Sequence, residues 1–306
     1  MFKILSIDGG GFRGIYAAHI LKKIEEIYNV SWTTDFNMIT GTSTGSIIAA
    51  GLVAGISAKD IVDLYEALGN KVFKKRFLGN FPGASLFMSP YNVKILKKEL
   101  DDVFHNKPPL GKIEFPLLIP ATDIGNGSVY VFKSQYSPDF VRDKDVELED
   151  AVAASCSAPM YFDPCKADDY LLADGGLWAN SPAIIAAVDA KYRLQRSFDE
   201  LQVLSIGTCG NRTYYSQKRG FWNKIFGWGF LTRWNKAQLV DMILNLQVQS
   251  ANNLLRLVLN PNQILRIDSK SNIALDDPSM KDDLITRADK DFTNNSQKIE
   301  HFLQAK

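Results

Sequence analysis

Residues 36–54 read FNMITGTSTGSIIAAGLVA, and this stretch decides the fold class. Its first five residues are largely apolar and predict a short strand, and the run of small and apolar residues at Thr44–Ala54 predicts a buried helix. The turn between them has the pattern Gly-x-Ser-x-Gly, with Ser43 between Gly41 and Gly45. In a strand–turn–helix of this kind the serine stands on a strained turn, and glycines leave room for close neighbours. The stretch predicts a nucleophilic serine; the alternative is a glycine-rich turn that caps a buried helix.

Strand-like and helix-like patterns alternate on both sides of this stretch. Further strands are predicted at Phe2–Ile7, Phe115–Ala121, Val129–Lys133, Tyr170–Ala173, Gln202–Ile206 and Ile264–Ile267. Further helices are predicted at Ile15–Tyr28, Ser57–Leu68, Asn92–Phe104, Leu148–Ser155, Ala183–Tyr192, Lys236–Leu257 and Asp282–Gln304. The alternation predicts an α/β fold of three layers, a mainly parallel sheet with helices on both faces, and a helical C-terminal region.

A glycine-rich segment, Asp8-Gly-Gly-Gly-Phe-Arg-Gly14, joins the first predicted strand to the first predicted helix. Consecutive glycines let backbone N–H groups face a cavity, and a helix N-terminus adds positive potential. The segment therefore suits a phosphate or the oxyanion of an acyl-transfer intermediate. No Gly-Lys-Ser/Thr follows, as a Walker loop requires, and the glycine spacing does not fit a dinucleotide fingerprint. An ordinary tight turn is the alternative, although such a turn has no need of Arg13.

Asp174-Gly175-Gly176 follows the predicted strand Tyr170–Ala173. An acid at the end of a strand lies where the active sites of parallel sheets open, so Asp174 is a candidate catalytic carboxylate. The alternative is a turn in which the aspartate is a capping residue.

The three histidines are informative because none follows the Ser43 turn in a strand-to-helix loop. They are His19, inside a predicted helix, and His105 and His301, near the ends of two others. Either Ser43 is not a nucleophile, or its base is not histidine.

Composition excludes some functions. Among 306 residues, 35 Lys and Arg balance 34 Asp and Glu, so we expect no general attraction to DNA or RNA. Three cysteines without framework or metal-ligand spacing favour a reducing compartment. The short apolar N-terminus is no signal peptide, so we expect a cytoplasmic protein.

The glycine-rich segment, the GTSTG turn and Asp174-Gly175-Gly176 together resemble the three signature blocks of the patatin-like phospholipases. Ala154–Pro159 and Ser205–Thr208 also resemble blocks of that family, in the same order. The resemblance covers residues 2–210. It implies a patatin-like catalytic core at 1–210, which 211–306 complete as a basic, aromatic loop and C-terminal helices of the same domain.

The resemblance also implies a mechanism. In that family a Ser–Asp dyad replaces the triad, which makes Ser43 the nucleophile and Asp174 its base. Gly9, Gly10, Gly11 and Arg13 would line the oxyanion site, and Gly41 and Gly45 would form the nucleophile elbow. The expected reaction is phospholipase A-type cleavage of fatty-acyl esters in membrane phospholipids, which requires no metal or other cofactor. The alternative implied by the resemblance is an effector phospholipase of an anti-phage defence system, switched on by a cyclic nucleotide.

Two segments, Asn70–Pro90 and Arg212–Trp234, are predicted to be long loops. The second, extended to Lys236, combines six basic residues and eight aromatic residues with no acid. Such a composition suits the headgroup level of an anionic membrane, with contact through Trp222, Trp228, Arg219 and Lys224. We therefore expect peripheral attachment to the inner face of the membrane. The alternatives are a packed aromatic cap and, since the same side chains can stack bases, a cyclic-nucleotide site.

Overall fold

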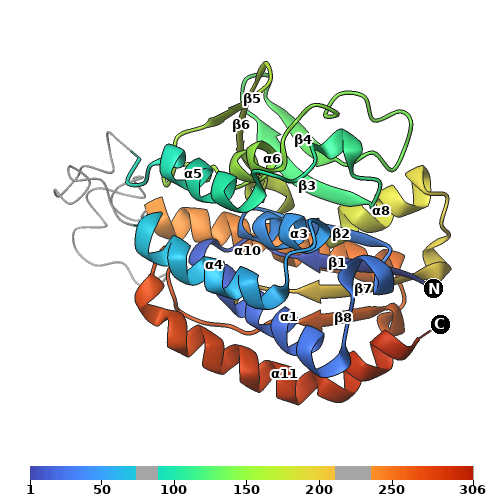
Figure 1. The fold of residues 1–306 in the computed structure, drawn as a ribbon. Helices are drawn as coiled ribbons and strands as arrows, with labels where there is room; N and C mark the ends of the chain where they lie inside the picture. The colour runs from blue at the N-terminus through green and yellow to red at the C-terminus, as the bar shows by residue number, and fades with distance from the viewer. Residues whose placement is uncertain (74–88, 211–235, 306) are drawn as a thin grey trace, which may run out of the picture.

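Figure 1 shows the computed structural model of the chain, which describes residues 1–73, 89–210 and 236–305. The strands are β1 (Phe2–Ile7), β2 (Met38–Gly41), β3 (Leu117–Asp123), β4 (Ser128–Lys133), β5 (Cys165–Ala167), β6 (Tyr170–Asp174), β7 (Leu201–Ile206) and β8 (Ile264–Ile267). The helices are α1 (Gly14–Tyr28), α2 (Trp32–Asp35), α3 (Thr44–Val53), α4 (Ala58–Lys71), α5 (Val93–Phe104), α6 (Leu148–Ser155), α7 (Gly176–Ala179), α8 (Ala183–Arg193), α10 (Lys236–Val258) and α11 (Lys281–Gln304).

One sheet forms the middle layer, in the order β5-β6-β3-β2-β1-β7-β8, with β4 paired to β3 outside this path. The pairs β2–β3, β1–β2, β1–β7 and β7–β8 are parallel. The pairs of β3 with β4 and β6, and of β5 with β6, are antiparallel. The predicted α/β fold with a mainly parallel sheet is thus confirmed. The sequence pattern missed β5, which has three residues and is too short for a periodic signal.

Helices cover both faces of the sheet, because the strands are apolar on both sides. Leu5 and Ile7 of β1 belong to the larger apolar cluster, which includes α1, α3, α4, α5, α6 and α11. Ile4 of the same strand belongs to a second cluster with α8 and the C-terminal part of α10. Adjacent residues of a strand point to opposite faces, so β1 serves both layers. Figure 1 shows α1, α4 and α11 side by side on one face.

Strand β3 has two partners in succession along one edge, and this feature positions the site. Its first residues, Leu117 and Leu118, pair with β2, whereas Ala121–Asp123 pair with β6. Because β6 is antiparallel to β3 and β2 is parallel to it, the carboxyl ends of β2 and β6 face each other beside β3. The residues that follow β2 and the last residue of β6 therefore meet.

The C-terminal region joins the same layers. Strand β8 extends the sheet beside β7, and α11 packs along α1. The Lys3 ammonium donates a hydrogen bond to the Leu303 carbonyl at 2.6 Å, which places the two termini side by side (Figure 1). No helix in the described part of the chain combines the length and the apolar character needed to cross a membrane.

Candidate active site

Ser43 stands between β2 and α3 in a backbone conformation that few residues other than glycine adopt. Its φ is 53° and its ψ is −125°. A β-carbon added to Gly41 would lie 2.0 Å from the Gly45 carbonyl oxygen, and one added to Gly45 would lie 2.4 Å from the Ile7 carbonyl oxygen. Both glycines are therefore required by the close approach of backbone on backbone. Positive φ at a serine is strain that the surrounding structure must maintain.

Hydrogen bonds hold this turn from both sides. The Ser43 N–H donates to the Ser155 hydroxyl at 2.9 Å, and that hydroxyl donates to the Pro120 carbonyl at 2.6 Å. The Ser46 hydroxyl donates to the Ser43 carbonyl at 2.6 Å. Both backbone groups of Ser43 are thus engaged, and the residue lines the cavity.

Asp174, the last residue of β6, is buried and lies beside Ser43. The Ser43 hydroxyl lies near enough to the Asp174 carboxylate to favour its ionised form, and the Gly176 N–H donates a hydrogen bond to Oδ1 at 2.6 Å. On its main chain, the N–H donates to the Ser157 carbonyl at 3.0 Å. We expected this acid at the open end of a parallel strand, but β6 is antiparallel to its neighbour. It meets Ser43 because the ends of β2 and β6 converge.

Burial alters the acidity of Asp174. Removal from water raises the pKa of its carboxyl from 3.8 to about 6, and the nearby Ser43 hydroxyl and the hydrogen bond from the Gly176 N–H oppose the rise. At neutral pH the group is still mainly ionised, and it is a stronger base than an ordinary aspartate. Direct proton transfer from the serine needs such a base.

The glycine-rich loop between β1 and α1 supplies hydrogen-bond donors on the other side of Ser43. Gly10 and Gly11 line the cavity, and neither of their N–H groups has a partner within the described residues. Gly11 has a φ of 59°, in the left-handed region that favours glycine. Two adjacent unpaired N–H groups beside a serine hydroxyl are suited to a tetrahedral oxyanion.

Gly9 and Arg13 are the other two residues expected to line the oxyanion site, and both have hydrogen-bond partners away from the cavity. The Gly9 N–H donates to the Asn180 carbonyl at 2.9 Å. The buried Arg13 guanidinium donates to the Gly10 carbonyl at 3.3 Å and to the Ile273 carbonyl at 3.2 Å. Neither residue lines the cavity. Both residues support the loop in this structure, and a direct role for them at the oxyanion stays a prediction from the sequence.

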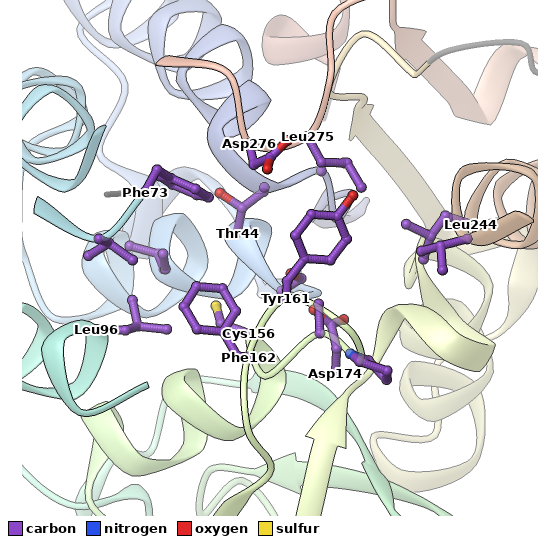
Figure 2. Close-up of a pocket in the computed structure, with 18 of the residues that line it drawn as sticks. Thr44, Phe73, Leu96, Cys156, Tyr161, Phe162, Asp174, Leu244, Leu275 and Asp276 are labelled. Carbon is purple, nitrogen blue, oxygen red and sulfur yellow. The ribbon is translucent and has the colours of Figure 1, made fainter. Parts of the chain in front are cut away.

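Ser43, Asp174, Gly10 and Gly11 line one cavity, whose other walls are largely apolar. Figure 2 shows its apolar side, with Phe73, Leu96 and Phe162, opposite Asp174 and Leu244. The apolar wall comes mainly from Ile47 of α3, Leu68 of α4 and Leu96 of α5, with Val72 directly after α4. Such a cavity suits a hydrocarbon chain, with its reactive carbonyl at the polar end.

None of the three histidines lines this cavity. His19 is bonded to Asp289 of α11, and His105 and His301 lie exposed near the ends of α5 and α11. Trp222, Trp228, Arg219 and Lys224, proposed for membrane or ligand contact, lie outside the described residues.

Sequence patterns missed several residues of the site. Asn180 is bonded to both backbone groups of Gly9, since its carbonyl accepts from the Gly9 N–H and its side chain donates to the Gly9 carbonyl. Asp276 lines the cavity and accepts a hydrogen bond from the Tyr91 hydroxyl at 2.6 Å. The one available signal was Asn180-Ser-Pro shortly after the Asp174 turn. In the described residues no group of histidine, cysteine, aspartate and glutamate side chains could hold a metal ion.

The chain is similar to proteins of known class. A family described as patatin-like phospholipase matches residues 5–187. A cGAMP-activated phospholipase of Pseudomonas aeruginosa (strain BWHPSA011 / Pa011) is 30% identical over 271 residues, which cover 88% of this chain and 79% of that protein. A cUMP-AMP-activated phospholipase of Escherichia coli is 27% identical over 292 residues, which cover 92% and 84%.

Among solved structures, VipD from Legionella pneumophila aligns with a TM-score of 0.50. The alignment covers 97% of this chain and 66% of that one, at 13% identity. Identity at this level shows the shared fold alone.

Proposed function

The chain belongs to the patatin-like phospholipase family, and we propose that Ser43 and Asp174 are the catalytic pair with which it cleaves the acyl esters of lipids. One observation carries the proposal. The Ser43 hydroxyl and the buried Asp174 carboxylate line one largely apolar cavity, which also presents two backbone N–H groups that have no partner among the described residues. Nucleophile, base and oxyanion donors are the three parts that acyl transfer needs.

The reaction proceeds in two balanced halves. Asp174 takes the proton of the Ser43 hydroxyl while Oγ attacks the ester carbonyl, and the N–H groups of Gly10 and Gly11 stabilise the oxyanion. When the C–O bond of the ester breaks, Asp174 returns the proton to the leaving alcohol, and the acyl group remains on Ser43. Asp174 then removes a proton from water as the water oxygen attacks the acyl carbon, and it returns that proton to Ser43 Oγ when the Oγ–acyl bond breaks and the fatty acid leaves.

The shape of the cavity supports a fatty-acyl ester as substrate. The carbonyl carbon would lie at Ser43, and the hydrocarbon chain would extend toward Phe73 and Leu96 (Figure 2). Burial of the chain contributes about 0.8 kcal/mol per CH₂ group. We infer that phospholipids of a membrane surface supply this ester.

The test of the pair uses Ser43→Ala and Asp174→Asn. We expect Ser43→Ala to release no fatty acid from phospholipid vesicles. Asp174→Asn should lower kcat by about two to four orders of magnitude, because it keeps an acceptor for the Gly176 N–H but removes the base. Fatty-acid release and the melting temperature are measured together.

Asp143→Asn is the matched control, since Asp143 and Asp174 are each 4% exposed and Asp143 lies outside the cavity. The pair is the wrong assignment if folded Asp174→Asn retains the activity of the wild type.

A second proposal concerns regulation. Two relatives are named for activation by cyclic dinucleotides, and both are similar to this chain over most of its length. We infer that this phospholipase is switched on in the same way, as an effector in anti-phage defence. The segment 212–236 stays a candidate for membrane or nucleotide contact on its composition.

To test regulation, the protein is mixed with phospholipid vesicles, with and without cGAMP or cUMP-AMP. We expect one of these nucleotides to raise fatty-acid release at least tenfold, and the Ser43→Ala protein to stay inactive with both. Equal release with and without each nucleotide would favour a constitutive lipid hydrolase or a different activator.

A further inference from the structure

Thr208 does not line the cavity, yet it lies directly against the loop that supplies the oxyanion donors. Its side chain is 3% exposed. The hydroxyl donates a hydrogen bond to the Gly9 carbonyl at 2.7 Å. A β-carbon on Gly10 would lie 2.1 Å from the Thr208 hydroxyl oxygen and 2.6 Å from its β-carbon. Thr208 thus fixes both the orientation of the Gly9–Gly10 peptide and the space around it.

The planar geometry of the peptide bond links this contact to the direction of the Gly10 N–H. The described part of the chain contains no cis peptide bond, and in a planar trans peptide the C=O and the following N–H point in opposite directions. A Gly9 carbonyl that points toward Thr208 therefore directs the Gly10 N–H to the other side, where the cavity lies. Arg13 acts in the same way on the next peptide, because it holds the Gly10 carbonyl and so directs the Gly11 N–H.

Thr208 is well placed for this role because its own backbone is fixed. It follows β7, the parallel neighbour of β1, so it lies at the same edge of the sheet as the glycine-rich loop. The Gly207 N–H donates to the Ile267 carbonyl at 2.8 Å, and the Cys209 N–H donates to Asp268 at 3.3 Å. The second donor to the Gly9 carbonyl, the Asn180 side chain, is at 3.5 Å, the long limit of a hydrogen bond.

We propose that Thr208 is a positioning residue for acyl transfer, whose hydroxyl holds the Gly9–Gly10 peptide so that the Gly10 N–H faces the oxyanion. The inference rests on the proposed function of Ser43 and Asp174. Oxyanion donors stabilise the transition state only when they are oriented before the reaction begins. A hydrogen bond to the Gly9 carbonyl also polarises that peptide, which strengthens its N–H as a donor.

Thr208→Val tests the proposal, because valine keeps the shape of threonine and lacks the hydroxyl. With a short soluble ester, we expect kcat to fall by about tenfold or more, with KM changed by less than about twofold. Thr208→Ser, which keeps the hydroxyl, should retain kcat within about threefold of the wild type.

Thr40→Val is the matched control for the loss of a buried hydroxyl. Thr40 is fully buried, and its hydroxyl donates to a backbone carbonyl, that of Leu118, at 2.9 Å, but it does not line the cavity. We expect a similar loss of melting temperature in both valine variants, and a loss of kcat in Thr208→Val alone. Unchanged kcat in folded Thr208→Val, or equal loss in Thr208→Ser, would overturn the proposal. If Thr208→Val does not fold, Thr208→Ala replaces it in the same comparison.

Crystal structures of the wild type and of the folded hydroxyl-less variant decide the question independently of activity. We expect the Gly9–Gly10 peptide to rotate or lose order in the variant, and an unchanged peptide would contradict the inference. A wild-type protein that hydrolyses no ester, with or without cGAMP or cUMP-AMP, would instead count against the proposed function, while the peptide orientation would still test Thr208.

Discussion

At the scale of single residues, the chemistry of the site depends on where each charge is placed. Asp174 is removed from water and carries its negative charge next to the Ser43 hydroxyl, which makes it a competent base. Arg13 carries a buried positive charge, and its hydrogen bonds go to two main-chain carbonyls behind the loop. The cation therefore shapes the loop, and the donors that face the cavity are backbone N–H groups.

The raised pKa of Asp174 predicts how activity depends on pH. The base must be ionised, so kcat/KM should be level above about pH 7 and fall about tenfold per unit below pH 6. An aspartate at its ordinary pKa of about 3.9 would keep activity to pH 4. Initial rates with a soluble ester between pH 4.5 and 8.5 measure this profile, and the fluorescence of the folded protein at each pH is the control. A level profile down to pH 5 would contradict the assignment of Asp174 as base.

At the scale of elements, the strand–turn–helix around Ser43 depends on helix α3 lying against the end of β1. Only glycine fits at position 45, because an added β-carbon would lie 2.4 Å from the Ile7 carbonyl oxygen and 2.8 Å from that of Asp8. Both of those groups belong to the backbone beside the glycine-rich loop. The approach of α3 therefore places the nucleophile and the oxyanion donors next to each other.

Gly45→Ala should therefore destabilise the protein by more than about 3 kcal/mol and abolish hydrolysis, because backbone atoms cannot move aside. Gly51→Ala in the same helix is the matched control. Its added β-carbon would first meet the end of the Ile61 side chain, at 2.9 Å, and alanine favours the helix by about 1 kcal/mol. Urea unfolding and ester hydrolysis of both variants measure the difference. Equal stability of the two variants would show that α3 can move away from β1.

At the scale of the whole molecule, we propose that residues 211–306 complete one domain with the core at 1–210. Arg266 of β8 donates to Asp8 at 2.5 Å and to the Ser205 hydroxyl at 2.7 Å, directly beneath the glycine-rich loop. Helix α11 covers α1 through a buried row that includes Leu284 and Phe292. Val240 and Leu244 of α10 line the cavity. These contacts support a single cooperative unit.

Phe292→Ala tests this proposal by weakening α11 far from the cavity. We expect a loss of about 3–5 kcal/mol, typical for a large buried side chain, seen as one calorimetric transition at a lower temperature. Activity should disappear at that same transition. Asn294→Ala, an exposed position of the same helix, should leave the transition unchanged. Two separate transitions, or activity that survives the first, would mean that the C-terminal region is an independent unit.

The sequence by itself determined the elements and the chemical candidates. Apolar periodicity located β1, α1, α3 and β8 to within a residue or two, because such patterns are local. The glycines beside Ser43 predicted the strained turn, since close backbone contact leaves few other residues possible. The absence of a placed histidine predicted that any base would be a different residue.

Only the tertiary structure decided how these residues work together. Ser43 and Asp174 meet because β2 and β6 pair with successive parts of β3 from opposite directions, and pairing between distant segments leaves no local pattern. The pKa of Asp174 depends on its burial, which many elements create together. The direction of the Gly10 N–H depends on a threonine from another strand end. Packing between elements that are distant in sequence sets each of these properties, so none could be derived from the residues in order.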